Sequence, residues 1–258
     1  MDLELAGQVV LITGGTDGLG LALARQLVAE GASVAICGRN EERLSAAVAG
    51  LEAAGGDAVG VQADVEHAED IRRFVEAAVA RWDRIDGIVH NAGRSAAGPL
   101  ESTDDATWEG DLQLKLMGAV RLTRLALPHL RQRQGAAVFT LAMAAKAPGP
   151  ASTPSAVSRA AGMALMKALS KELGPDGVRC NAILIGLIES GQWVRSAAAA
   201  GVELPEFYDR MAAGAGIPLG RVGRAEEFAD LACFLLSARS SYLTGTAINL
   251  DGGLSPAV

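Results

Sequence analysis

Short apolar runs alternate along the chain with longer segments in which apolar residues recur every three or four positions. The first run, Val9-Val10-Leu11-Ile12, is followed by a glycine-containing turn and then by residues 21–28, whose apolar spacing is helical. Buried strands of parallel sheets read as continuous apolar runs, whereas helices that cover a sheet show the 3.6-residue period. The chain therefore begins with a predicted strand, tight turn and helix.

The same alternation continues to the end of the chain. Further strands are predicted at 32–37, 57–61, 86–90, 136–141, 178–184 and 246–250, and further helices from 41 and at 69–82, 108–133, 152–173 and 225–237. Strands that alternate with helices imply parallel pairing through right-handed crossovers. We expect an α/β fold of about seven parallel strands, a doubly wound Rossmann-type sheet with helices on both faces, as a single domain over 1–258.

Residues 188–220 interrupt this alternation. The segment is rich in Ala and Gly and is too long for an ordinary connection. Insertions after the carboxyl end of a strand commonly close over a ligand. We therefore predict a lid-like insertion at 188–220.

The residues after the first predicted strand are typical of a nucleotide-phosphate site. They read Thr13-Gly14-Gly15-Thr16-Asp17-Gly18-Leu19-Gly20. Glycines let backbone N–H groups approach a diphosphate, and the start of a helix supplies unpaired donors and partial positive charge. A merely structural turn is the alternative, but the position between a first strand and a first helix favours a dinucleotide site.

The second predicted strand ends in an arginine, Arg39. In dinucleotide folds an acidic residue at this point binds the ribose hydroxyl, whereas an arginine suits a 2′-phosphate. Arg39 therefore favours NADP over NAD, although a solvated charge is the alternative. The carboxyl ends of the first four strands carry Gly14, Arg39, Asp64 and Asn91, which should line one crevice.

Composition and charge exclude other classes. The net charge of −7 argues against nucleic-acid binding, because affinity for phosphate needs a basic surface. The three cysteines lie far apart in apolar runs, which favours buried thiols over a metal site or disulfides. The acidic start is unlike a signal peptide and no apolar run approaches a membrane span, so we expect a cytoplasmic protein without a membrane partner.

These landmarks together resemble the short-chain dehydrogenase/reductase family, from Leu5 to Gly253. The matching pieces are the glycine stretch, Asp64-Val65, Asn91-Ala92-Gly93, Trp108 with the long helix to Ala126-Leu127-Pro128, Val178-Arg179-Cys180-Asn181-Ala182, Ile217-Pro218-Leu219-Gly220-Arg221, Tyr242-Leu243-Thr244-Gly245 and Asp251-Gly252-Gly253. The resemblance implies an NAD(P) cofactor and often a homotetramer. It implies that the cofactor-binding residues are Gly14, Thr16, Asp17, Gly18, Leu19, Gly20, Arg39, Asp64, Val65, Asn91, Ala92, Gly93, Arg159, Ile188 and Ser190.

The residues on which this family's chemistry depends are replaced. The family uses a tyrosine, a lysine four residues later, a serine about 13 residues before the tyrosine and an asparagine in the long helix. These positions fall on Ser155, Arg159, Ala142 and Lys115, in that order. A serine hydroxyl is a far weaker acid than a phenol, and arginine stays charged in proteins, so neither replaces the usual acid directly.

Lys115, Ser155 and Arg159 are our candidate catalytic residues. Lys115 and Arg159 would bring two cations to the substrate position, which suits an anionic substrate or a developing oxyanion. A lysine with a depressed pKa also acts as an acid or base. The alternatives are a Lys115 that extends to solvent and a Ser155 that is only a first-turn helix residue. Lys146 and Thr140 are further candidates beside the crevice.

Three functions remain open. The first is an oxidoreductase that transfers a hydride between NADP(H) and a small carbonyl or alcohol substrate, with water or Lys115 supplying the proton. The second is a non-catalytic NADP-binding sensor or scaffold, and the third is a non-redox enzyme acting on an anionic compound. In the resembled family the helix that carries Ala160-Ala161-Gly162 and Ala164 commonly meets its copy, which implies a homo-oligomer, a dimer or a tetramer.

Overall fold

The computed structural model describes residues 1–258 and contains one seven-stranded parallel sheet. Its strand order is β3-β2-β1-β4-β5-β6-β7, so the order of strands reverses between β1 and β4. The strands are β1 (Val9–Thr13), β2 (Ser33–Gly38), β3 (Ala58–Gln62), β4 (Gly87–His90), β5 (Ala136–Ala142), β6 (Arg179–Ile185) and β7 (Ala247–Leu250). This confirms the predicted doubly wound Rossmann-type sheet. A crevice at such a reversal is where open α/β sheets bind ligands.

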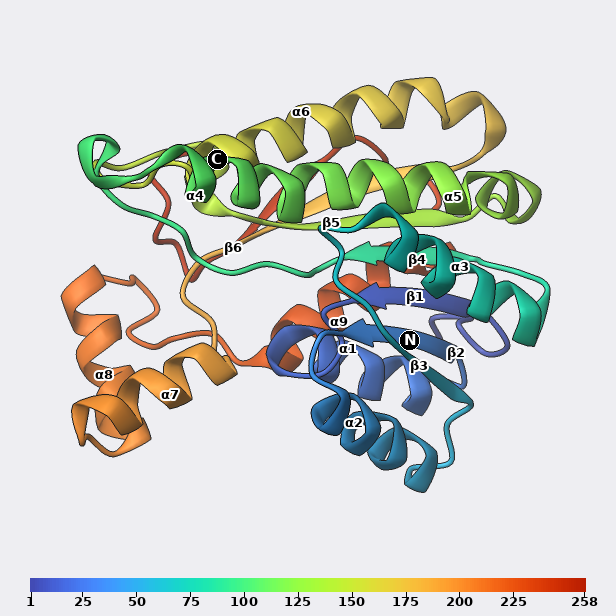
Figure 1. The fold of residues 1–258 in the computed structure, drawn as a ribbon, viewed down its shortest axis with the longest axis horizontal. Coiled ribbons are helices and arrows are strands. Elements are labelled where there is room, and N and C mark those ends of the chain that lie inside the picture. The colour runs from blue at the N-terminus through green and yellow to red at the C-terminus, as the bar shows by residue number, and fades with distance from the viewer.

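Helices cover both faces of the sheet (Figure 1). The helices are α1 (Gly18–Ala29), α2 (Glu41–Ala53), α3 (Ala68–Trp82), α4 (Asp105–Leu112), α5 (Gly118–Arg133), α6 (Ser155–Glu172), α7 (Gly191–Ala200), α8 (Leu204–Ala215) and α9 (Ala225–Leu236). In Figure 1, α1, α2 and α9 lie below the sheet, and α3, α5 and α6 lie above it. The sheet is therefore the middle of three layers.

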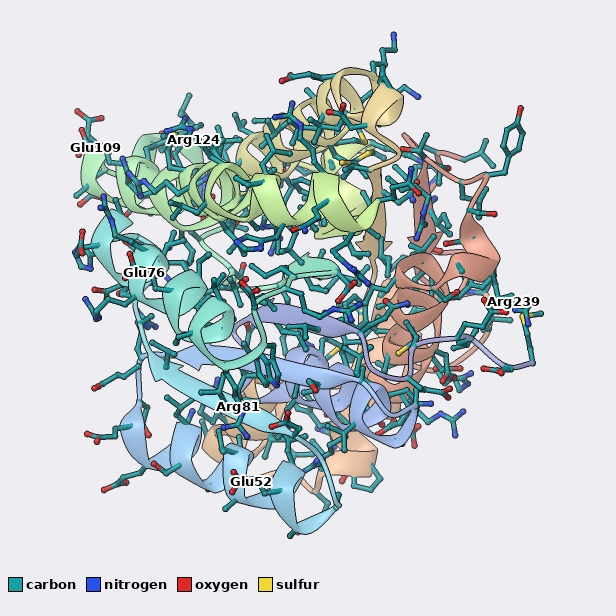
Figure 2. The ribbon with its side chains drawn as sticks, turned by 90° about the vertical axis from the view of Figure 1, so that its right-hand side faces the viewer. Glu52, Glu76, Arg81, Glu109, Arg124 and Arg239 are labelled. Atoms are coloured by element: carbon teal, nitrogen blue, oxygen red, sulfur yellow. The ribbon has the colours of Figure 1, made fainter.

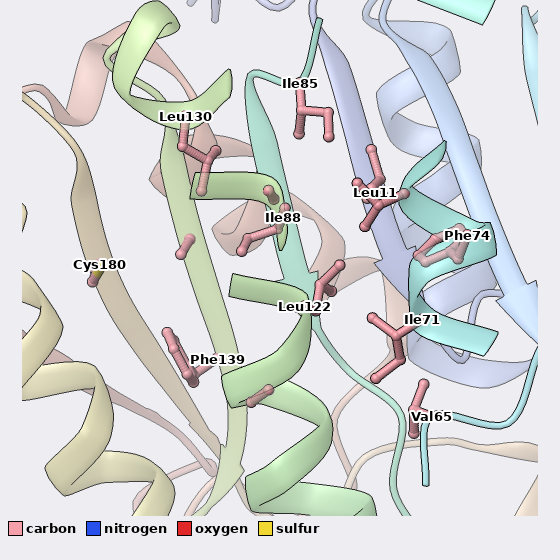
Figure 3. Close-up of a cluster of buried hydrophobic side chains, with 14 of the residues drawn as sticks. Leu11, Val65, Ile71, Phe74, Ile85, Ile88, Leu122, Leu130, Phe139 and Cys180 are labelled. Atoms are coloured by element: carbon pink, nitrogen blue, oxygen red, sulfur yellow. The ribbon is translucent and has the colours of Figure 1, made fainter. Parts of the chain in front are cut away.

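Each strand contributes alternate side chains to two apolar cores. Leu11 and Ile88 pack with Phe74, Leu122 and Phe139 on the face covered by α3, α5 and α6 (Figure 3). The intervening strand positions pack against α1, α2 and α9 in a second cluster. Burial on both faces explains why the strands are continuously apolar in sequence.

The helical stretch predicted at 108–133 is continuous in the structure, but its middle is not α-helical. It begins three residues earlier, at Asp105, where the Asp104 carboxylate accepts a hydrogen bond of 2.9 Å from the Thr107 N–H. Between α4 and α5 it passes through a π-helical turn, Gln113–Met117. Such turns are frequent at functional sites, and this one carries Lys115.

The helix predicted at 152–173 starts three residues later in the structure. Helix α6 begins at Ser155, and no side chain caps it. The Ser152 hydroxyl instead donates to the Gly149 carbonyl at 2.6 Å, because short polar side chains readily bond within their own turn. Gly162 in the same helix is buried, and a Cβ there would lie 3.0 Å from Leu141 Cδ2, so this glycine faces its own sheet.

Residues 188–220 are more ordered than the sequence indicates. They contain α7 and α8, which project beyond the carboxyl ends of the strands at the lower left of Figure 1. Each of these helices ends at a glycine with positive φ, Gly201 and Gly216. The many Ala and Gly residues of the segment hide the apolar periodicity by which a helix is recognised in a sequence.

Charged side chains gather at the periphery, whereas the thiols are inside. Glu52 and Arg81 are exposed, and Figure 2 shows Glu109 and Arg239 at the edge of the molecule. All three cysteines are free and buried, as predicted, and burial raises the pKa of Cys37 to about 12. None of the helices is both long enough and apolar enough to span a bilayer.

Candidate active site

The glycine loop between β1 and α1 is held tightly against the end of β4. The Asn91 side-chain amide donates to the carbonyl oxygens of Thr13 and Gly14, at 3.0 Å each. A Cβ on Gly20 would collide with the Gly14 carbonyl and lie 2.5 Å from Asn91 Nδ2. Gly14 also has a φ of +67°, which favours glycine. The loop thus has the close backbone packing that a dinucleotide site requires.

The start of α1 fits an anionic ligand. Asp17 precedes the helix, and its carboxylate accepts a hydrogen bond of 2.7 Å from the Gly18 N–H. Its second oxygen lies 3.4 Å from Arg195 Nη1 in α7. The start of α1 therefore already binds one negatively charged group, and a diphosphate would bring negative charge to the same place.

The end of β2 places an exposed arginine beside this loop. Thr16 packs so closely on Gly38 that a Cβ there would lie 2.6 Å from Thr16 Cγ2. Arg39 follows Gly38, is 63% exposed, and has its guanidinium 3.8 Å from Asp64 Oδ2. A contact this long and exposed contributes little, so the guanidinium remains available to an anion.

Two more of the predicted cofactor residues, Val65 and Ser190, belong to other segments of the chain. Val65 is buried, and a Cβ on Gly118 would lie 3.2 Å from its carbonyl oxygen. Ser190 Cβ would lie 3.6 Å from a Cβ on Gly18, so the start of α7 meets the glycine loop. The Thr13 hydroxyl, which the sequence analysis did not single out, accepts from the N–H groups of Asn91 and Ala92 at 3.0 and 3.1 Å.

Lys115 is buried, and the alternative that it extends to solvent is wrong. Only 2% of its side chain is exposed, and its ammonium donates to the Asp111 carboxylate and, at 2.8 Å, to Ser155 Oγ. Burial and the nearby Arg159 cation lower the pKa of Lys115 to about 8, against the opposing effect of Asp111. Lys115 therefore changes charge close to neutral pH.

Asp111 is the site residue that sequence reasoning missed. It is buried one helical turn before Lys115, and its second oxygen accepts from Ser158 Oγ at 2.6 Å. The sequence contains a signal for it, because a carboxylate four residues before a lysine lies on the same helix face. Its burial, however, depends on the packing of α4 against α6.

Ser155 is the meeting point of three segments. Its Oγ accepts hydrogen bonds from the Ala96 N–H at 2.9 Å and from Lys115 Nζ at 2.8 Å. Both bonds use lone pairs of the oxygen, so the hydroxyl proton stays available to a third group. Ser155 is half-buried, which leaves it accessible from the crevice.

Arg159 lies one turn further along α6. It donates to the Thr140 carbonyl, and a Cβ on Gly93 would lie 2.7 Å from its Nη2. Burial lowers the pKa of Arg159 to about 10, so the guanidinium stays charged at neutral pH. The buried Thr140 hydroxyl has no hydrogen-bond partner in the protein. Thr140, Lys115 and Arg159 all line a cavity of about 10 Å³.

Lys146 points elsewhere. Its ammonium donates to the Ala247 carbonyl at 2.9 Å and to Asn249 Oδ1 at 3.2 Å. It therefore joins the loop after β5 to β7, and it forms no hydrogen bond with Ser155.

Comparison with known proteins agrees with this fold and crevice. Residues 14–255 match the family model described as enoyl-(acyl carrier protein) reductase. A putative ketoacyl reductase of the monensin polyketide synthase from Streptomyces virginiae is 36% identical, with 97% of this chain and 98% of the relative covered. A 3-oxoacyl-[acyl-carrier-protein] reductase from Thermotoga maritima is 33% identical, with 98% and 99% covered.

A solved structure is similar over the same extent. The NADPH-bound structure of a short-chain oxidoreductase from Pseudomonas aeruginosa PAO1, described as containing an atypical catalytic centre, has a TM-score of 0.92 and 36% identity. The match covers 98% of this chain and 100% of that one. The chain belongs to the short-chain dehydrogenase/reductase family and is an NAD(P)-dependent oxidoreductase by class.

Proposed function

We propose that this protein is an NADP-dependent carbonyl reductase in which Ser155 and Lys115 do the work of the family's usual tyrosine and lysine. The observation that carries the proposal is the 2.8 Å hydrogen bond between Lys115 Nζ and Ser155 Oγ, beside the buried Asp111. An ammonium that donates to a hydroxyl oxygen makes that hydroxyl a better proton donor. The pair can therefore deliver a proton that serine alone would hold too tightly.

In this proposal, the residues predicted from the sequence hold the cofactor. Gly14, Gly18 and Gly20 with the start of α1 suit the diphosphate, and Arg39 suits the 2′-phosphate. Asn91 holds the loop in shape through two hydrogen bonds. The NADPH in the similar Pseudomonas aeruginosa structure supports the same choice of cofactor. When bound, the reduced nicotinamide supplies the hydride.

The protein's own groups handle the proton and the charge. The Ser155 hydroxyl proton passes to the carbonyl oxygen of the substrate as that oxygen gains negative charge. Lys115 then returns a proton to Ser155 across the hydrogen bond between them. Arg159, on the same face of α6, keeps a positive charge near the developing oxyanion.

The segment 188–220 acts as the lid in this proposal. Its helix α7 begins against the glycine loop, and Arg195 pairs with Asp17 across the mouth of the crevice. Closure would exclude water from Ser155 and Lys115, which strengthens every charge interaction there. We also propose that the protein forms a homo-oligomer, on the family resemblance alone, and that it lies in the cytoplasm.

A ketone is the substrate class that this chemistry suits. Two relatives are named for reduction of 3-oxoacyl or ketoacyl groups, so 3-oxoacyl thioesters are the first compounds to offer. Transfer of deuterium from 4-deuterated NADPH into the product alcohol, detected by mass spectrometry, tests the proposal. Ser155→Ala should lower the rate by about 100-fold. Ser152→Ala, which removes a hydroxyl bonded only to the Gly149 carbonyl, should not change it.

A non-catalytic NADP-binding protein is the second candidate. The observation that favours it is the absence of a phenol at the reacting position, since Ser155 stands there. Tight NADPH binding without any deuterium transfer, in wild type and over a broad panel of ketones, would establish this alternative.

A further inference from the structure

Ser155 and Lys115 have the arrangement of a nucleophile and its base. We propose that this pair also hydrolyses activated carboxylic esters, without any nicotinamide cofactor. The proposal goes beyond the reductase function and does not depend on it. It rests on the hydrogen bonds that Lys115 makes to Ser155 and to Asp111.

An activated serine needs a base within hydrogen-bond reach and a third group that orients the base. Lys115 Nζ lies 2.8 Å from Ser155 Oγ, and Asp111 binds the same ammonium from the preceding helical turn. Asp111 is itself fixed by Ser158 Oγ at 2.6 Å. The Ala96 N–H, 2.9 Å from Ser155 Oγ, holds the nucleophile in place.

Ser155 is the accessible member of this group of residues. Lys115, Asp111 and Ser158 are buried, whereas Ser155 is half-buried at the crevice. The base is thus shielded from water, and only the nucleophile meets a substrate. Ser152, three residues earlier, is half-buried like Ser155, but its hydroxyl bonds only to the Gly149 carbonyl and has no base beside it.

The charges around Lys115 decide when it is a base. Arg159 and Arg94 disfavour its ammonium form, Asp111 favours it, and His90 on the same cavity is neutral because burial lowers its pKa to about 3. The net result is the pKa of about 8 for Lys115. Above that pH the amine accepts the Ser155 proton, and below it the ammonium donates.

The reaction balances without a redox partner. The Ser155 oxygen attacks the ester carbonyl while its proton moves to the neutral Lys115 amine. The bond between the carbonyl carbon and the leaving oxygen breaks, and that oxygen takes the proton from Lys115. Water then attacks the acyl-serine in the same way, which releases a carboxylic acid and restores Ser155. The Arg159 guanidinium, one helical turn from Ser155, offsets the negative charge on the carbonyl oxygen.

The test uses the full-length protein and 4-nitrophenyl acetate, with no nicotinamide present. We expect hydrolysis whose rate rises with pH through about 8 and then levels off. Ser155→Ala should lower the rate by about 100-fold, and Ser152→Ala should leave it unchanged. Lys115→Arg keeps the ion pair but cannot serve as a base, so it should also lose the reaction.

A second measurement identifies the nucleophile directly. A fluorophosphonate probe should add one phosphonyl group to the protein, and peptide mass spectrometry should find it on Ser155. Thermal unfolding of each variant checks that it folds. Equal hydrolysis by wild type and Ser155→Ala, or a phosphonyl group on any other residue, overturns the proposal. Because the assays contain no cofactor, they separate this proposal from the reductase function.

Discussion

Asp111 and Lys115 lie one helical turn apart and form an ion pair with only 1% and 2% of their side chains exposed. Removing one member leaves the other charge buried without its partner. Lys115→Met should therefore lower the free energy of unfolding by about 3–5 kcal/mol. The double variant Asp111→Leu with Lys115→Met should recover most of that loss, because a well-packed apolar pair replaces a buried ion pair at little cost.

Urea denaturation of the wild type, both single variants and the double variant measures this coupling. Strictly additive losses in the double variant would contradict a buried, mutually dependent pair.

The reduction of a ketone should depend on pH through Lys115. The ammonium form is the proton source, and the pKa of Lys115 lies at about 8. With NADPH saturating, kcat should be constant below that pH and fall above it. Asp111→Asn removes the negative charge that raises this pKa, so the fall should begin at a lower pH.

Lys115→Arg provides the matched control for the pH profile, because arginine stays charged over this range. The fall in kcat above pH 8 should disappear in that variant. Persistence of the same fall would assign it to a group other than Lys115.

Arg39 should decide between the two nicotinamide cofactors. Arg39→Ala removes a charge-assisted contact to the 2′-phosphate, so the Kd for NADPH should rise by about 10- to 100-fold while that for NADH changes little. Arg72→Ala, an exposed arginine on α3 paired with Glu69, is the control and should alter neither. Isothermal titration calorimetry measures both constants. Equal weakening of NADPH and NADH would remove Arg39 from phosphate recognition.

Substitution of glycine by alanine should be damaging at Gly20 and stabilising at Gly50. Gly20→Ala forces a Cβ against the Gly14 carbonyl and the Asn91 amide, so the loop must shift and NADPH binding should be lost. Gly50→Ala, in the interior of α2 with no atom within 4 Å of the added Cβ, should stabilise the protein by about 0.5–1 kcal/mol. Thermal unfolding with and without NADPH distinguishes the two effects. Retained binding in Gly20→Ala would contradict the close packing of the loop.

Sequence patterns alone are enough to predict the sheet, its covering helices and a nucleotide site in the crevice. These depend on local patterns: apolar runs in strands buried on both faces, helical spacing between them, and glycines after β1. Parallel pairing then brings Gly14, Arg39, Asp64 and Asn91 to one edge without further information. Even so, the ordered helices α7 and α8 escaped prediction, because their Ala-rich segments carry little periodic contrast.

The pairing of the polar groups around Ser155 follows from long-range packing, which no local pattern reveals. Lys115 and Ser155 are 40 positions apart, and their contact depends on how α4, the π-helical turn and α6 pack. The same packing buries Asp111, fastens Lys146 to β7 and turns Ser152 back on its own loop. Local periodicity says which face of a helix is apolar. Which polar side chains share a buried volume follows from long-range packing, and that sharing sets the charge and pKa of Lys115.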